Sequence, residues 1–178
     1  MKKGIVLYRS KYGTTEKYAH WLAEAVNFAC ADVNQAKIDQ LSQYDVVIFG
    51  GGIYASGISG LSFLRKHYDV LKNKTLAVFC VGASPYDEKT FAQICSHNLK
   101  DDLKDIPCFY CRGGWNEEAM SWKDRTLCQL LQKMVAKKDP SAYEPWETAL
   151  MAGAGKVCDW TDSKYLEPIL DFVAGQER

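Results

Sequence analysis

Apolar residues along this chain fall into two recurring patterns, short continuous runs and longer segments with helical spacing. The run at residues 4–8 is typical of a strand buried on both faces. Similar runs predict further strands at residues 32–38, 45–49, 75–81 and 106–111. The run at 32–38 is the weakest of these. Five strands are therefore expected.

Helical patterns separate the strands. Apolar residues recur every three to four positions in segments near residues 15–28, 59–71 and 87–99, and again from about Thr161 onward. Pro168 lies inside the last pattern, which predicts a kink or a late helix start. Strands that alternate with helices predict an α/β fold with a parallel sheet covered on both faces.

Residues 113–157 do not fit this alternation. They contain an amphipathic helical pattern formed by Leu127, Leu130, Leu131, Met134 and Val135, followed by an irregular part rich in proline, glycine and tryptophan. The sequence has no internal repeat and no low-complexity tract. It is therefore expected to form one domain over residues 1–178, with an insertion at approximately 113–157.

Composition excludes several classes of protein. The 178 residues carry 22 basic and 22 acidic side chains, so the net charge of zero argues against a broad nucleic-acid surface. No apolar run approaches the roughly 18 residues of a membrane span, and the N-terminus does not resemble a signal peptide. A cytoplasmic protein is expected, with membrane contact at most peripheral.

The seven cysteines are odd in number and scattered through apolar segments, as expected for reduced thiols. Only Cys108 and Cys111 have CxxC spacing. They fall in a predicted strand, where a separation of three puts the two sulfurs on opposite faces. No redox pair and no metal site is predicted, because the three histidines have no candidate ligand near them.

Candidate chemistry lies in the loops that follow the strands, since ligands of such sheets bind beyond the carboxyl ends of the strands. The first loop reads Ser10-Lys11-Tyr12-Gly13-Thr14-Thr15 and leads into a helix. Its hydroxyls and N–H groups can enclose a phosphate at the helix N-terminus. They can equally serve as a helix cap, and the residues alone leave both interpretations open.

Other phosphate-binding patterns are missing. The sequence has no G-x-x-x-x-G-K-[ST], no G-x-G-x-x-G after the first strand and no acidic pair at its end. These absences argue against ATPase, dinucleotide-dehydrogenase and receiver functions.

The loops after the third and fourth strands carry small residues and one tyrosine each. Residues 50–57 include four glycines and Tyr54, and residues 82–86 include Gly82 and Tyr86. Each tyrosine alone is more often a surface aromatic. Because two of them occupy matching positions in adjacent loops, we predict a planar ring held between them.

With these three loops, the sequence resembles the flavodoxin superfamily, over roughly residues 3–112 and again in the final helix. The superfamily's phosphate pattern, approximately [TS]-x-[TS]-G-x-T, reads here as residues 10–15, with Tyr12 in place of a small hydroxyl residue. The resemblance implies FMN as cofactor and a doubly wound five-stranded parallel sheet of order 2-1-3-4-5. The implied FMN contacts are Ser10, Lys11, Tyr12, Gly13, Thr14, Thr15, Gly51, Gly52, Ile53, Tyr54, Gly82, Ala83, Ser84 and Tyr86.

Within the superfamily, the sequence is most similar to the subgroup that contains menaquinone-dependent protoporphyrinogen dehydrogenase. The similarity rests on residues 46–54, the long insertion and Asp159-Trp160 before the last helix. It implies a redox protein or a quinone as partner and a porphyrinogen as possible substrate. Because flavodoxins that act as general carriers are strongly acidic, the net charge of zero favours a dedicated FMN-dependent oxidoreductase.

Two classes of function stay open on the sequence. One is an FMN protein for electron transfer, as a carrier or as an oxidoreductase of the protoporphyrinogen IX dehydrogenase type in heme biosynthesis. The other is an interaction module that has lost FMN. The basic residues of the insertion fit either an anionic lipid or substrate beside Trp115 and Trp122, or a helix packed on the sheet with a solvated basic face. The second is the commoner arrangement.

Overall fold

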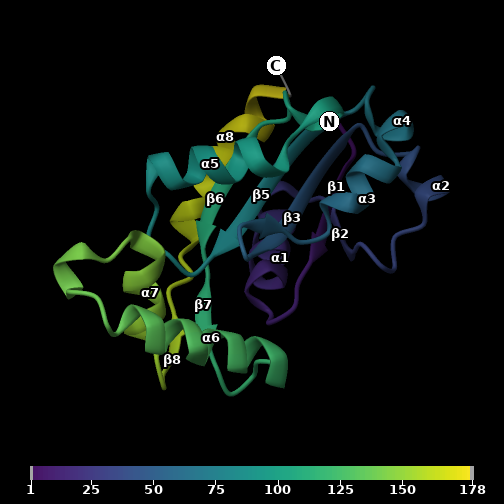
Figure 1. Ribbon diagram of the computed structural model, residues 1–178. Coiled ribbons are helices and arrows are strands. Elements are labelled where there is room, and N and C mark those ends of the chain that lie inside the picture. The colour runs from purple at the N-terminus through teal and green to yellow at the C-terminus, as the bar shows by residue number, and fades with distance from the viewer. Residues whose placement is uncertain (1, 177–178) are drawn as a thin grey trace.

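The computed structural model describes residues 2–176 and contains a parallel sheet at its centre (Figure 1). Its strands run in the order β2-β1-β3-β5-β6, which confirms the predicted order. A short strand β4 pairs antiparallel with the end of β3. The bounds are β1 Gly4–Arg9, β2 Ala29–Asp32, β3 Val46–Tyr54, β4 Gly57–Ile58, β5 Thr75–Gly82 and β6 Cys108–Arg112.

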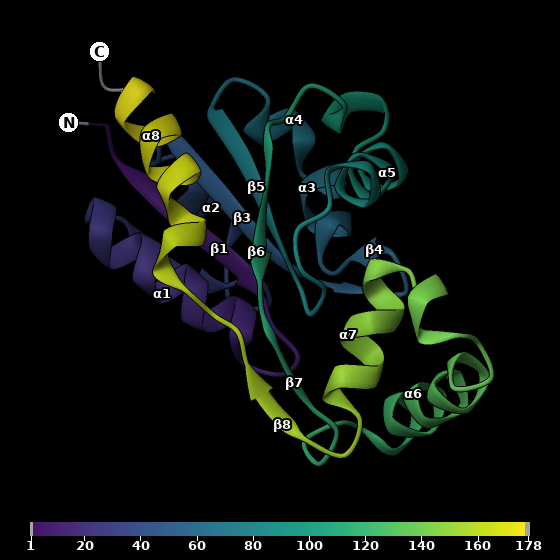
Figure 2. The ribbon, with the colours of Figure 1, turned by 90° about the vertical axis from the view of Figure 1, so that its left-hand side faces the viewer.

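Helices cover both faces of the sheet, as Figure 2 shows. On one face α1 and α8 enclose a core around Val6, Ile48 and Phe79. On the other face α3, α4 and α5 enclose a core around Leu7, Phe49 and Val78. The bounds are α1 Thr14–Val26, α2 Ile38–Leu41, α3 Leu61–Lys66, α4 Tyr68–Leu71, α5 Glu88–Asn98 and α8 Glu167–Gln176.

Two strands differ from the prediction. Strand β2 ends at Asp32, because the chain then turns and the Asp32 carbonyl accepts from the N–H groups of Gln35 and Ala36, at 2.9 and 3.2 Å. The expected strand over 32–38 is therefore wrong. Strand β3 runs on through residues 50–52, which were expected to be a loop. A Cβ on Gly50 would lie 2.1 Å from the Phe79 ring. Glycine therefore lets the strand continue where this ring crosses it.

Pro168 and the CxxC pair behave as predicted. Helix α8 starts late, with Pro168 as its second residue, after a 3-10 turn at Ser163–Leu166. Cys108 packs against one core and Cys111 lies inside the other, so the two free thiols face opposite sides of β6. None of the helices in residues 2–176 is long and apolar enough to cross a membrane.

The insertion forms a separate lobe below the carboxyl edge of the sheet (Figures 1 and 2). An antiparallel pair, β7 (Gly114–Asn116) and β8 (Val157–Asp159), carries the chain out and back. Between them lie α6 (Trp122–Val135), a 3-10 turn at Pro140–Ala142 and α7 (Pro145–Gly153). Helix α6 contacts α7 rather than the sheet, so the expected packing of this helix on the sheet is wrong.

Candidate functional site

The loop after β1 is built around a left-handed glycine at the start of α1. Gly13 has a φ of +91° and occupies the N-cap position, which a residue with a side chain rarely adopts. The Ser10 hydroxyl accepts the Gly13 N–H at 3.0 Å, and no side chain among residues 2–176 caps the helix. The first N–H groups of α1, at Thr14 and Thr15, thus have no acceptor in the described part of the chain. This arrangement favours the phosphate interpretation over the cap.

The insertion reaches this loop through Asp124, near the start of α6. Its carboxylate accepts from the Lys11 ammonium and from the Tyr12 hydroxyl. The Ser121 N–H also donates to the Tyr12 oxygen at 3.3 Å. The bond from Lys11 lowers the pKa of Asp124, and the same bond raises the pKa of Lys11. Asp124 therefore positions the two side chains that follow Ser10.

Sequence reasoning missed Asp124. It lies 113 residues after Lys11, inside the insertion, and no local pattern marks it as a partner of the loop. Only the return of the insertion across the sheet edge brings the two together.

Tyr54 ends β3 and lies beside the first loop. The turn that follows it, at Ala55 and Ser56, has φ values of +46° and +65°. The Tyr54 ring lies with its centroid 6.1 Å from that of Tyr12, and the Lys11 ammonium lies 5.6 Å from the Tyr54 ring centroid. Partial burial raises the pKa of Tyr54. The ends of β1 and β3 are thus brought together, as the predicted site requires.

Gly51 and Gly52 lie inside β3, and neighbouring groups occupy the space that side chains would take. A Cβ on Gly51 would lie 2.4 Å from the Ser59 carbonyl oxygen, and one on Gly52 would lie 2.9 Å from the Tyr54 ring. Ile53 reaches across to the next strand, where its Cδ1 lies 3.1 Å from the position of a Cβ on Gly82. Close packing inside the protein therefore explains why glycine occupies positions 51, 52 and 82. The explanation needs no bound ligand.

Two side chains of the edge strand β6 donate hydrogen bonds to the loop after β5. The Ala83 carbonyl accepts from Arg112 Nε at 3.2 Å, and the Ser84 carbonyl accepts from the Tyr110 hydroxyl. Burial raises the pKa of Tyr110 and keeps this hydroxyl a neutral donor. Arg112 was not predicted, although its place at the carboxyl end of a strand marks it as a candidate. Its guanidinium lies 4.5 Å from the Trp160 ring centroid.

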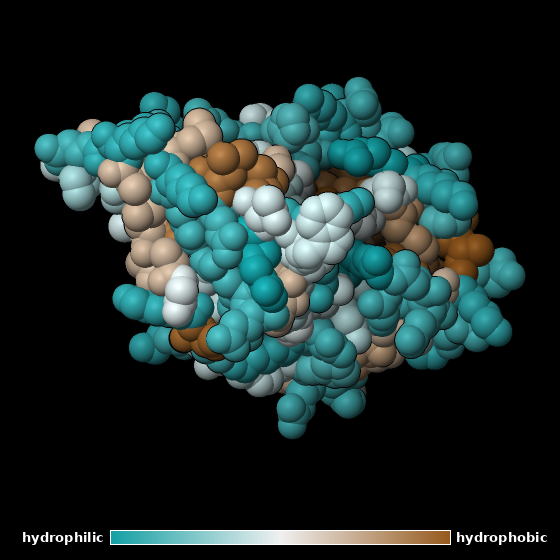
Figure 3. Space-filling model, turned by 60° about the horizontal axis from the view of Figure 1, so that its bottom comes forward, coloured by the Kyte–Doolittle hydropathy of each residue, from teal (hydrophilic) through white to brown (hydrophobic). Residues whose placement is uncertain are grey.

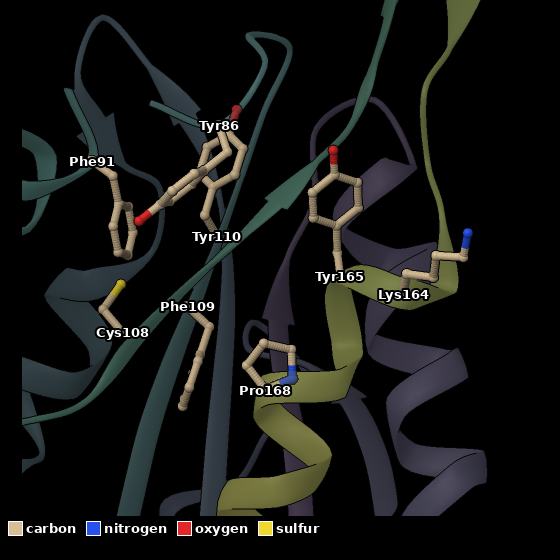
Figure 4. Close-up of a pocket in the computed structure, with 8 residues that line it drawn as sticks. All are labelled: Tyr86, Phe91, Cys108, Phe109, Tyr110, Lys164, Tyr165 and Pro168. Carbon is tan, nitrogen blue, oxygen red and sulfur yellow. The ribbon is translucent and has the colours of Figure 1, made fainter. Parts of the chain in front are cut away.

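Tyr86 lines an aromatic cavity of about 340 Å³ whose lining does not include Tyr54 (Figure 4). Its ring lies 5.7 Å from that of Phe91 and 5.9 Å from that of Tyr110, centroid to centroid. Figure 4 shows these three rings on one side of β6 and Phe109, Tyr165 and Pro168 on the other. The two predicted clamp tyrosines therefore belong to different clusters, and a ring held between them stays a prediction.

A comparison with models of protein families shows which family has this architecture. The model of a family described as a flavodoxin domain matches residues 5–142, which include all three loops and α6. The chain belongs to the flavodoxin domain family. Membership agrees with the strand order and with the position of the loops at the carboxyl edge of the sheet.

Individual relatives of this flavodoxin-domain protein are distant. An uncharacterized protein of Methanocaldococcus jannaschii is 25% identical over 123 residues, which cover 64% of this chain and 77% of that protein. A crystal structure of a putative flavoprotein from Bacteroides eggerthii is 19% identical with a TM-score of 0.49, covering 78% of this chain and all of that one. The two-electron reduced flavodoxin of Megasphaera elsdenii is 17% identical with a TM-score of 0.45, covering 60% and 82%.

Proposed function

We propose that this protein binds FMN at the carboxyl edge of its sheet and uses it for electron transfer. The observation that carries the proposal is the start of α1, where Gly13 turns the chain and the first N–H groups lack a protein acceptor within residues 2–176. Such a terminus favours a phosphate by hydrogen bonding and by the helix dipole. In a flavodoxin domain the phosphate of FMN is the matching ligand.

The donor set fits that phosphate. The main-chain N–H groups of Thr14 and Thr15 and the Lys11 ammonium would hold it, while residues 51–54 and 82–86 would flank the ring. When bound, FMN supplies the electron transfer itself, and the protein supplies binding, orientation and electrostatics. Asp124 engages Lys11 and so offsets part of its positive charge beside the loop. The main-chain groups therefore supply the larger part of phosphate binding.

The decisive experiment measures FMN binding directly. We expect the purified protein to be yellow and to release FMN on denaturation. After removal of FMN, the apoprotein should bind FMN about a hundredfold more tightly than riboflavin, since riboflavin lacks the phosphate and the charge-assisted bonds it makes. A colourless protein that ignores added FMN would instead support the interaction module. Equal affinity for the two flavins would show that this loop does not hold the phosphate.

At a finer level, we propose a dedicated oxidoreductase of the protoporphyrinogen dehydrogenase type rather than a general carrier. A net charge of zero and an insertion bonded to the first loop support this choice. The test is oxidation of protoporphyrinogen IX by the FMN-loaded protein, with menaquinone as acceptor. Turnover with this pair would support the enzyme. Exchange of electrons with a redox protein, without porphyrinogen turnover, would support the carrier.

A further inference from the structure

Helix α6 turns a large apolar surface to solvent. The exposed fractions are 73% for Trp122, 52% for Leu127, 55% for Leu130 and 57% for Met134. At about 100° per residue the last three fall within an arc of about 60°, so they form one continuous stripe. Monomeric proteins rarely leave such a stripe uncovered, because each exposed side chain forgoes the free energy of burial.

The opposite face of α6 is attached to the protein largely through polar groups. Arg125 donates to the carbonyls of Glu117 and Glu118, at 2.8 and 2.6 Å. The Gln132 amide donates to the Glu117 carboxylate, and Val135 is the buried apolar residue on this side. The helix is thus amphipathic with its apolar stripe outward. In a helix packed on the sheet, Leu127, Leu130 and Met134 would face the core, and here they face solvent.

The charges on this outer face all have one sign. The exposed positions of α6 are Trp122, Lys123, Thr126, Leu127, Gln129, Leu130, Lys133 and Met134, and exposed Lys137 follows the helix. The acidic residue of α6, Asp124, is half-buried and paired with Lys11. Lys123 and Lys137 fall near the two ends of the stripe, about 21 Å apart along the axis at 1.5 Å per residue. The face therefore combines apolar side chains with three lysines that form no ion pair within residues 2–176.

We propose that the outer face of α6, defined by Trp122, Lys123, Leu127, Leu130, Lys133, Met134 and Lys137, binds an anionic lipid surface. Figure 3 views the molecule from the side of the insertion, where hydrophobic side chains lie exposed among hydrophilic ones. A lipid interface offers negative headgroups and apolar chains in one plane, which suits a protruding helix with lysines along its apolar stripe. A protein partner would need an apolar groove with an acidic rim of the same length.

Local charge has to drive this attraction, because the chain as a whole has zero net charge. The proposal does not depend on FMN. Binding to lipid and binding to FMN are separate measurements, so either proposal can fail while the other holds.

Flotation of the full-length protein with vesicles tests the proposal. We expect the protein to float with vesicles of phosphatidylcholine and phosphatidylglycerol in equal parts, to stay behind with pure phosphatidylcholine, and to dissociate as salt screens the charges. Replacing Lys123, Lys133 and Lys137 by glutamine should weaken binding about a hundredfold. Replacing Leu127, Leu130 and Met134 by serine should weaken it at least about tenfold.

Two controls test whether the variants fold and whether any exposed apolar side chain would affect flotation. Circular dichroism of both triple variants should match that of the parent, because every changed side chain is exposed, on α6 or directly after it. Val70→Ser removes an apolar side chain of α4 that is 45% exposed and should leave flotation unchanged. Failure to float with anionic vesicles overturns the proposal. So does a dimer in sedimentation velocity that the serine variant abolishes, since the stripe would then be an interface between two copies.

Discussion

At the scale of single residues, two glycines show two different reasons for the same residue type. Gly13 is required by its backbone, since φ is +91° and a Cβ there would meet nothing within 4 Å. Gly50 is required by its surroundings, since a Cβ would lie 2.1 Å from the Phe79 ring. The first belongs to the candidate phosphate loop and the second to the core. Substitution separates the two roles.

Gly13→Val should weaken FMN binding by at least about tenfold while the fold persists, because a β-branched residue at this φ costs of order 1–3 kcal/mol in the loop itself. FMN titration monitored by fluorescence measures the effect. Gly155→Val is a matched control, since Gly155 has a φ of +66°, an open surrounding and a place in the insertion. It should lose similar stability and keep its FMN affinity. Unchanged affinity in Gly13→Val would show that the phosphate is held elsewhere.

Gly50→Ala should lower the free energy of unfolding by about 1–3 kcal/mol, because the added methyl group forces the buried Phe79 ring to move. Urea denaturation measures this loss. Adding Phe79→Leu should recover part of it by making room. Gly175→Ala, in α8 with nothing within 4 Å of its Cβ, should instead be neutral or slightly stabilising. An unaltered urea midpoint for Gly50→Ala would contradict the packing argument.

At the scale of elements, the insertion is fastened to the sheet domain at both ends. Near its start, Asp124 of α6 binds Lys11 and Tyr12 of the first loop. At its exit, Asp159 of β8 accepts from Lys17 of α1 at 2.8 Å. The remaining Asp159 oxygen accepts from the Thr161 N–H and hydroxyl, at 3.0 and 2.6 Å. These bonds fix where the lobe leaves and rejoins the sheet domain.

The Asp159 contact predicts a pH dependence. The bond from Lys17, with those from Thr161, lowers the pKa of Asp159 to about 2. The unfolded value is about 4, so the ionised carboxylate stabilises the fold above pH 4, and this contribution is lost as the pH falls towards 2. Asp159→Asn should cost less than about 1 kcal/mol at pH 7, since the pair is exposed to solvent. Its deficit should be much smaller near pH 2, where about half of the Asp159 carboxylates in the folded protein are protonated. An equal deficit at both pH values, measured by urea denaturation, would rule out the charge as its cause.

At the scale of the whole molecule, one buried hydroxyl joins segments far apart in sequence. Tyr18 of α1 is fully buried, and its hydroxyl donates to the Arg112 carbonyl at 2.6 Å. The same oxygen accepts the Asp162 N–H at 2.9 Å. Burial raises the pKa of Tyr18, so the hydroxyl stays neutral. It links α1, the end of β6 and the chain that returns from the insertion.

Tyr18→Phe should cost about 1–3 kcal/mol, because the Arg112 carbonyl and the Asp162 N–H both lose a buried partner. Urea denaturation gives the free energy, and near-ultraviolet circular dichroism reports on packing around α1. Tyr143→Phe is the matched control, since the Tyr143 hydroxyl makes no hydrogen bond within residues 2–176. A similar loss in both variants would show that the cost comes from removing any tyrosine hydroxyl, and not from the two bonds that the Tyr18 hydroxyl makes.

The resemblance to the flavodoxin superfamily implied the strand order of the sheet. Local patterns by themselves determined the parallel α/β sheet, the late start of α8 at Pro168 and the opposite faces of Cys108 and Cys111. Each of these depends on side-chain period or on the missing proline N–H, which act over a few residues. The tertiary structure alone decided that residues 50–52 stay in β3, that Asp124 engages Lys11, and that α6 turns its apolar stripe outward. These features depend on a ring, a carboxylate and a neighbouring helix that lie distant in sequence, and only folding brings them within contact.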